Sequence, residues 1–163
     1  MQKLRFIEIP NHSKGNGLRY GEAALKFVND LRLDQHELSM QVWKEYGHDV
    51  TGAKANQVST LSEVWDSPKC RATMLLVNKV PAAFVMTKRS GTYVAFWNFI
   101  VAQPFRHHGY GRMLMQHSID RHRKLGFTEM SLNVLAANTR ALDMYYESGF
   151  KPINMTMSLK LQG

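Results

Sequence analysis

The strongest constraint on the fold is the run from Tyr93 to Val101, which is apolar on both of its alternating faces. Such a run is typical of a central strand that is covered on both sides. Pro104 ends the run, and a helical pattern from Tyr110 to Leu125 follows, with Gly126 in the position of a C-terminal cap. A buried strand that leads directly into a helix indicates an α/β fold.

The rest of the sequence predicts elements in an order that mixes hairpins with crossover helices. Apolar or alternating runs predict further strands at Leu4–Ile9, Thr73–Val77, Val80–Met86, Met130–Val134 and Met155–Leu161. Helical spacing predicts further helices around Ala24–Leu31, around Leu38–Tyr46 and, capped by Asn138, around Ala141–Tyr145. We therefore expect one α/β domain over residues 1–163, a central mixed β-sheet of about six to seven strands flanked on both faces by about four helices.

Composition indicates the cellular compartment and the partners of this domain. Cys70 is the single cysteine, so no disulfide can form within the chain. No apolar run approaches the roughly 18 residues of a membrane span, and the first residues do not resemble a signal peptide. These features predict a cytoplasmic protein without a membrane partner. The net charge of +8 favours an anionic partner, such as nucleic acid, a membrane surface or a phosphorylated small molecule.

The basic residues are densest between Arg106 and Lys124, where two segments have different expected roles. Arg121–Lys124 is expected to be a solvated helix end that suits the negative end of the helix dipole. Gly109 and Gly111 lie where the helix begins, behind Arg106. A helix start offers unpaired N–H groups to an anion, and glycines let it approach the backbone, so the segment suits a pyrophosphate.

Two common phosphate motifs are excluded here, and a structural alternative is left open. The dinucleotide fingerprint needs a third glycine, and the triphosphate loop needs Gly-Lys-Ser/Thr where this chain has Gly111-Arg112-Met113. The alternative is a tight strand-to-helix turn that needs glycine for its geometry alone.

Two segments of the sequence resemble motifs of the GNAT superfamily of N-acyltransferases. Arg106–Gly111, which reads RHHGYG, is similar to the Arg/Gln-x-x-Gly-x-Gly/Ala signature of that family. The family's second pattern, Asn-x-x-Ala-x-x-x-Tyr-x-x-x-Gly-Phe, is matched by Asn138, Ala141, Tyr145, Gly149 and Phe150. The two motifs occur in the family's order and at a fitting separation.

The resemblance implies an acetyl-coenzyme A-dependent N-acetyltransferase in which an amine attacks directly in a ternary complex. It assigns the pyrophosphate to Arg106 and to the backbone amides of His107, His108, Gly109, Tyr110, Gly111 and Arg112. It assigns the pantetheine arm and the thioester carbonyl to the strand end Ile100, Val101 and Ala102. Asn138 would contact the coenzyme, and Tyr145 would face its sulfur. No metal is expected, because His107 and His108 lack a spaced set of further ligands.

The chemistry of acyl transfer is compatible with these residues. A thiol has a pKa of about 8.5 and a phenol of about 10, so a positioned Tyr145 could protonate the leaving thiolate. The attacking amine must lose a proton, yet the strand from Thr92 to Phe99 carries no carboxylate or histidine. The general base is therefore open, with four candidates in the part of the chain expected to bind the acceptor: Glu45, His48, Asp49 and Glu63.

Other functions and roles remain open at this point. Tyr145 could be a core aromatic, and the chain could bind coenzyme A without turnover or be a nucleic-acid-binding module. Nucleic acid is not the expected partner, because few aromatic residues lie among the basic ones. The expected partners are acetyl-coenzyme A and a small-molecule or peptide amine, and a homodimer is compatible with the sequence.

Overall fold

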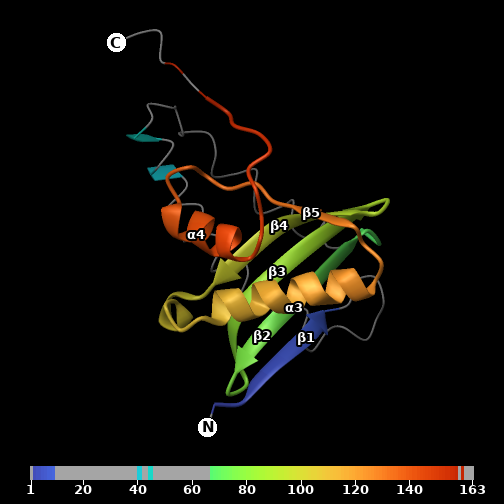
Figure 1. Ribbon diagram of the computed structural model, residues 1–163. Helices are drawn as coiled ribbons and strands as arrows, with labels where there is room; N and C mark the ends of the chain where they lie inside the picture. Colours follow the sequence, from blue (N-terminus) through green and yellow to red (C-terminus); the bar gives the residue numbers. More distant parts are fainter. Residues whose placement is uncertain (1, 10–39, 42–43, 46–66, 158, 160–163) are drawn as a thin grey trace.

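The computed structural model describes residues 2–9, 40–41, 44–45, 67–157 and 159 (Figure 1). The described residues form a five-stranded sheet in the order β1-β2-β3-β4-β5. The strands are β1 Leu4–Ile9, β2 Cys70–Val77, β3 Val80–Ser90, β4 Tyr93–Val101 and β5 Glu129–Ser131. The first four strands pair antiparallel, and β5 runs parallel to β4. The predicted mixed sheet is therefore confirmed.

The turn between β2 and β3 explains the tight hairpin at the centre of the sheet. Asn78 and Lys79 both adopt a positive φ, of 51° and 70°. Two successive residues with positive φ match the right-handed twist of paired strands, and asparagine tolerates this conformation better than most residues. The sequence Asn78-Lys79 therefore sets the register that places Val77 opposite Val80.

Two helices cover one face of the sheet. Helix α3 spans Tyr110–Lys124 and helix α4 spans Thr139–Glu147, while a short 3₁₀ turn, η1 Gln103–Phe105, joins β4 to the loop before α3. Figure 1 shows α3 lying across the strands and α4 beside the end of β4. Both helices contribute side chains to the same apolar layer.

Alternation along the central strands produces two apolar layers. On β3, Ala83 and Val85 face the layer beneath α3, and Phe84 and Met86 face the opposite layer. All four side chains are buried. The sheet is thus covered on both faces at β3, whereas β4, for which the apolar run predicted this, is covered less completely, since its Trp97 is 47% exposed.

Several predicted elements differ from the structure or lie outside the described residues. The strand predicted at Met130–Val134 ends at Ser131, and no strand forms at Met155–Met157 or at 159, so the last predicted strand is wrong there. The described residues hold five strands and two α-helices plus the helical residues 40–41 and 44–45, which lie within the helix predicted at Leu38–Tyr46. The helix predicted at Ala24–Leu31 lies outside the described residues. No described helix is long and apolar enough to cross a membrane.

One carboxylate on the first strand links it to α3. Glu8 accepts a hydrogen bond from the Thr73 hydroxyl at 2.9 Å and pairs with the Arg121 guanidinium at 2.9 Å. His117 lies 3.9 Å from the same carboxylate and stacks on Phe6. Because these side chains are only partly exposed, the ion pair is less screened by solvent than a surface pair.

The helix end Arg121–Lys124 is not fully solvated, because His122 is buried at 3% exposure. Its Nδ1 donates to the Ser118 carbonyl oxygen at 2.8 Å, and its Nε2 lies 3.0 Å from the Thr87 hydroxyl, which also lies 3.5 Å from the Arg71 carbonyl oxygen. Burial favours the neutral imidazole, whose Nε2 accepts from that hydroxyl. Burial accordingly lowers the pKa of His122 below its ordinary value, although the hydrogen bond to Ser118 opposes the shift. The prediction of a solvated end was wrong for this residue.

We expect His122 to make the fold acid-sensitive. Since its pKa is lower in the folded than in the unfolded chain, its contribution is complete above its unfolded pKa of about 6.5 and is lost as pH falls below it. His122→Gln retains one donor and one acceptor but does not titrate. Urea unfolding at pH 7.5 and pH 5.5 should show a larger loss of unfolding free energy in the wild type than in His122→Gln. Equal losses in the two proteins would contradict the assignment.

Candidate functional site

The loop before α3 presents a row of backbone amides. Gly109 is the N-cap of α3 and has a φ of 79°, and the first helical bond runs from the Met113 amide to its carbonyl. Within the described chain, none of the amides from His107 to Arg112 donates to a backbone carbonyl. Unpaired amides at the positive end of a helix dipole form a site suited to an anion.

Three side-chain contacts hold this loop in shape. The Arg106 Nε donates to the Val101 carbonyl at 2.9 Å, and the His108 Nδ1 lies 2.7 Å from the Arg106 carbonyl oxygen. Arg140 from α4 approaches the Nε2 of His107 at 2.8 Å. His107 has a φ of 68°, a conformation that costs energy in a residue with a Cβ. These contacts therefore fix the loop before any ligand is present.

Arg140 was not identified from the sequence alone. It lies two residues after Asn138, within the second motif. The first motif also carries cations, so a further cation in the second motif was a possible signal of anion binding. Nothing in the sequence, however, shows that the start of α4 lies against the loop before α3. That proximity is a property of the tertiary fold.

The second part of the site is an open edge of β4. Strand β5 pairs with β4 only from Tyr93 to Ala95, so the rest of β4 has no neighbour on that side among the described residues. The Ala102 amide donates to the carbonyl of Ala82 on β3. Antiparallel strands alternate bonded and non-bonded pairs, so the backbone N–H and C=O of Ile100 also point toward β3. The backbone groups of Phe99 and Val101 point toward the open side.

Gly111 lies against the protein interior rather than in open space. A Cβ built on Gly111 would lie 3.2 Å from the Met144 sulfur and 3.4 Å from a Val101 methyl. A Cβ on Gly109 would meet nothing within 4 Å, and its requirement for glycine comes from its positive φ. The two glycines therefore serve different needs: Gly109 shapes the turn, and Gly111 lets α3 approach β4 and α4.

Residues of the second motif also stabilise this fold. Asn138 is the N-cap of α4, and its side-chain oxygen accepts from the Ala141 amide at 3.3 Å. Tyr145 packs edge-on against Phe99 and Phe150, with ring centroids 6.5 Å and 6.0 Å away. Burial raises the pKa of Tyr145 to about 12. The ring position places Tyr145 beside Phe99, the residue whose backbone faces the open edge of β4.

The four candidates for the general base make no contact with this arrangement among the described residues or lie outside them. Glu45 is exposed and its carboxylate lies 3.5 Å from the Gln41 amide nitrogen, while His48, Asp49 and Glu63 are outside the described residues. In the part of the chain that the structure describes, no three metal-ligating side chains gather into a metal site.

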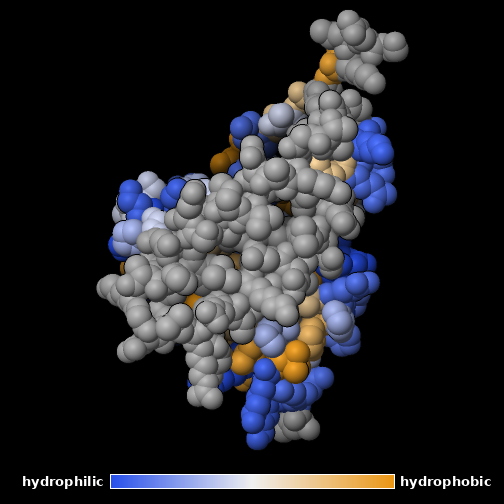
Figure 2. All heavy atoms as spheres, turned by 180° about the vertical axis from the view of Figure 1, so that it is seen from behind, coloured by the Kyte–Doolittle hydropathy of each residue, from blue (hydrophilic) through white to orange (hydrophobic). Residues whose placement is uncertain are grey.

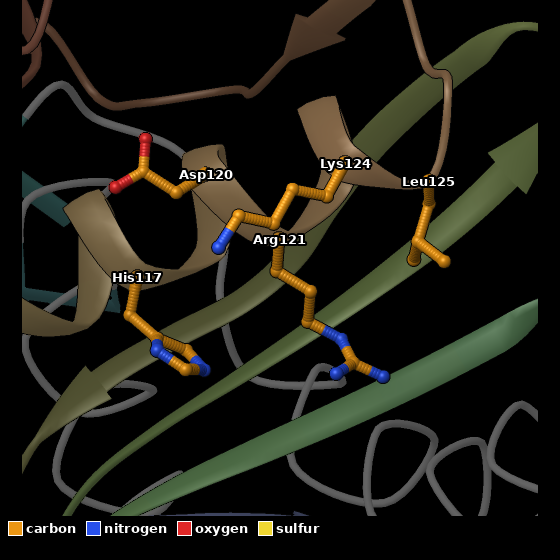
Figure 3. A pocket seen from close by; sticks show the side chains of 5 residues that line it. All are labelled: His117, Asp120, Arg121, Lys124 and Leu125. Carbon is orange, nitrogen blue, oxygen red and sulfur yellow. The ribbon is translucent and has the colours of Figure 1, made fainter.

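A separate pocket lies along the C-terminal half of α3. Its volume is about 370 Å³, and its described lining is His117, Asp120, Arg121, Lys124 and Leu125 (Figure 3). None of the predicted site residues lines it. The candidate site is therefore the loop before α3 together with the open edge of β4.

Comparison with known proteins identifies the class to which this fold and site belong. The model of the acetyltransferase (GNAT) family matches residues 28–150. A ribosomal protein bS18-alanine N-acetyltransferase from Salmonella typhimurium is 35% identical over 69 residues, which are 42% of this chain and 47% of that protein. The chain thus matches about half the length of that relative.

Solved structures show the same fold. The ribosomal-protein-S18-alanine N-acetyltransferase from Escherichia coli superposes with a TM-score of 0.57 at 26% identity, over 60% of this chain and 63% of that one. A mutant of the BH1408 protein from Bacillus halodurans superposes with a TM-score of 0.74 at 16% identity, over 97% and 99% of the two chains. Because the family match covers most of the sequence, the chain belongs to the GNAT acetyltransferase family.

The packing of Gly111 generates a stability prediction. The methyl added by Gly111→Ala overpacks the contact with Met144, a loss of about 1–3 kcal/mol of unfolding free energy that the higher helix propensity of alanine offsets by about 0.5–1 kcal/mol. That loss should shrink when Met144→Ala is also present, because the opposing sulfur is gone. Urea unfolding of the two single variants and the double variant measures this coupling.

Gly109→Ala is the matched control for this cycle. Its loss of unfolding free energy comes from the positive φ of residue 109, so the loss should be the same in the wild type as in the Met144→Ala background. If Gly111→Ala cost the same in both backgrounds, the contact with Met144 would not be the reason for glycine.

Proposed function

We propose that this protein is an acetyl-coenzyme A-dependent N-acetyltransferase that transfers the acetyl group to a primary amine by direct attack in a ternary complex. The observation that carries the proposal is the junction of β4 and α3. One short segment joins an open strand edge to a row of unpaired amides at a helix start. Membership of the acetyltransferase family supports the same chemistry.

The loop before α3 suits the pyrophosphate of the donor. The amides from His107 to Arg112 have no backbone partner among the described residues, and Arg106 and Arg140 bring guanidinium groups to the loop. Within the same part of the chain, Arg106 uses only its Nε, on Val101, which leaves its terminal nitrogens for phosphate oxygens. An anion bound there is stabilised both by the amides and by the helix dipole.

The open edge of β4 suits the extended pantetheine arm. Amide groups of the arm can pair with a strand edge as a further strand would. The register favours the backbone groups of Phe99 and the amide of Val101 for this role, whereas the Ala102 amide is already bonded to Ala82 and the Val101 carbonyl to Arg106. Of the three strand-end residues expected from the sequence, Val101 is therefore the one we retain. An N–H at this edge can also stabilise negative charge on the thioester oxygen.

The hydroxyl of Tyr145 is assigned to the leaving sulfur. With a pKa of about 12, it stays protonated at neutral pH. Full transfer of its proton to a thiolate whose conjugate acid has a pKa of about 8.5 is uphill by about 3.5 pKa units. We therefore assign Tyr145 the role of hydrogen-bond donor to the developing thiolate, rather than the full proton donor that the ordinary phenol pKa had indicated. Asn138, already the cap of α4, holds that helix in place for this contact.

A thiol-release assay with acetyl-coenzyme A tests the proposed function. The first acceptor to test is a peptide with an N-terminal alanine, because the Salmonella and Escherichia coli relatives are named for alanine acetylation of a ribosomal protein. Polyamines, aminoglycosides and free amino acids complete the panel. We expect amine-dependent release of thiol and an acetylated product by mass spectrometry.

Donor binding is measured alongside turnover to interpret a negative result. Coenzyme A should raise the melting temperature by binding the folded state. A rise without turnover on any amine would favour the alternative of a coenzyme A-binding protein without transferase activity. No rise at millimolar coenzyme A would overturn the donor assignment itself.

We expect Tyr145→Phe to lower kcat by about tenfold to a hundredfold, the range for one hydrogen bond to a charged group. The donor affinity should change little, since the bond forms mainly in the transition state. The ring and its packing on Phe99 and Phe150 are retained. Tyr146→Phe is the matched control, because Tyr146 is 51% exposed on the same helix.

Steady-state kinetics on an accepted amine and coenzyme A titrations check this prediction. Equal kcat in the wild type and both variants would show that Tyr145 is only a core aromatic and that the sulfur leaves without its help.

A further inference from the structure

The register between β3 and β4 contains one irregularity, and it falls at Trp97. Met86 of β3 lies opposite Asn98 of β4. The next residue of β3, Thr87, lies opposite Phe96, so Trp97 is the extra residue of a β-bulge. Bulges re-aim side chains and are common beside active sites. This one lies just beyond the last residue at which β5 pairs with β4, and it therefore marks the place where the two strands separate.

Trp97 projects from the face of the sheet opposite α3 and α4. The Thr87 hydroxyl contacts His122 of α3, so Thr87 faces the helices, and alternation along the strand turns Lys88 to the other face. The Lys88 Nζ lies 4.8 Å from the centre of the Trp97 ring, which places the indole on that same face. Figure 2 shows the molecule from this side, where hydrophilic side chains gather at the end of the sheet that carries the turn between β3 and β4.

The proposed position of the donor gives the two faces of its thioester different surroundings. An arm that pairs with β4 as a further strand lies in the plane of the sheet, and so does a thioester carbonyl bonded to an edge N–H. One face of that carbonyl looks toward the α4 side, where Tyr145 packs on Phe99. The other face looks toward the side of Trp97. An amine attacks a carbonyl through one of its faces, and Tyr145 occupies the first, so the amine enters from the second.

The acetyl end of the donor also lies close to Trp97 along the strand. The pyrophosphate site follows the end of β4, so an arm that leaves it runs back along the edge toward the place where β5 separates. Phe99 is two residues from Trp97, a distance of at most about 6–7 Å along a strand. Consecutive Cα atoms of a peptide are about 3.8 Å apart. A side chain one or two residues after an attacking α-amine therefore reaches the indole and Lys88.

The charge beside Trp97 is positive. Lys88 is partly buried and forms no ion pair with any described residue. An ammonium over the face of an indole is held in one position without being neutralised. Such a group attracts a carboxylate and repels a second cation. The net charge of +8 over the whole chain acts in the same direction.

We propose that Lys88, held over Trp97, selects amine acceptors that carry a carboxylate close to the amine, such as a peptide whose second or third residue is acidic. The proposal rests on the proposed function, because it takes the position of the donor from it. Trp97 is a positioning residue, since its ring fixes the ammonium of Lys88. Polyamines and aminoglycosides are disfavoured by the same charge, because they present further ammonium groups.

Matched peptides measure this selectivity. Ala-Glu-Ala, Ala-Gln-Ala and Ala-Lys-Ala with amidated C-termini differ only in the charge of the second residue. One partly exposed charge pair changes affinity by about two- to fivefold. We therefore expect kcat/KM for the acidic peptide to exceed that for the basic one by about four- to twenty-five-fold, and the ratio to fall as salt is raised. A free C-terminus on Ala-Gln-Ala distinguishes a terminal carboxylate from one on a side chain.

Charge reversal separates the effect of Lys88 from that of the overall charge. Lys88→Glu should reverse the preference, and Lys88→Gln should remove it. Arg89→Glu is the matched control, because the same change of charge falls on the opposite face of the sheet and should leave the ratio as in the wild type. Trp97→Leu should weaken the preference without reversing it, since Lys88 keeps its charge but loses its fixed position. Equal kcat/KM for the acidic and basic peptides in the wild type, or a preference that survives Lys88→Glu, would overturn the proposal.

Peptide binding is measured as well, so that a failure of selectivity is distinguished from a failure of the proposed function. Fluorescence anisotropy of the labelled peptides, with coenzyme A present, reports on this surface without any chemistry. Tighter binding of the acidic peptide that Lys88→Glu reverses, without acetylation of any peptide, would uphold the selectivity and overturn the transferase. Equal turnover and equal binding of all three peptides would overturn the selectivity alone. Neither turnover nor binding of any peptide would overturn both.

Discussion

The incomplete pairing of β4 is the constraint on which the site depends. This strand bonds β3 along its length but is paired with β5 only at its first residues, from Tyr93 to Ala95. A buried backbone cannot leave polar groups without partners at low cost. The outward groups beyond Ala95 that have no partner among the described residues therefore need water or a ligand with amide groups; the Val101 carbonyl is already bonded by Arg106. The same strand delivers the chain to the start of α3, so the open edge and the unpaired helix amides are neighbours by covalent connection.

Helix α4 keeps this arrangement rigid through contacts with the start of α3. Arg140 approaches His107 in the loop, and Met144 lies against Gly111. Arg112 forms an exposed salt bridge with Glu147 at the end of α4. The Gly111 contact matters most for packing, because a Cβ there would lie 3.2 Å from the Met144 sulfur. The loop is thus fixed from both of its neighbours, which lowers the entropy that a bound anion would have to remove.

The sequence was a good guide wherever local chemistry decides the structure. The bounds of β4 and α3, the hairpin turn at Asn78-Lys79 and the capping by Asn138 follow from apolar alternation, turn residues and helix caps. Predictions from the sequence failed where tertiary contacts determine the structure. His122 has the sequence context of a solvated helix end, but the position of Thr87 on β3 buries it. Arg140 and the facing of Phe99 rather than Ile100 depend on helix placement and strand register, which no local pattern encodes.

Most residues of the two motifs have a structural reason to be what they are. Gly109 is needed for a positive φ, Gly111 for close packing, Asn138 for a helix cap, and the Tyr145 ring for the core beside Phe99. A chain that had lost its activity could keep all of these for stability alone. The Tyr145 hydroxyl is different: no described residue forms a hydrogen bond with it, and phenylalanine would fill the same space. Tyr145 is only partly buried, so its hydroxyl meets water and the core gains nothing from it. Contact with the leaving sulfur, as proposed above, is therefore the role that would distinguish tyrosine from phenylalanine at this position.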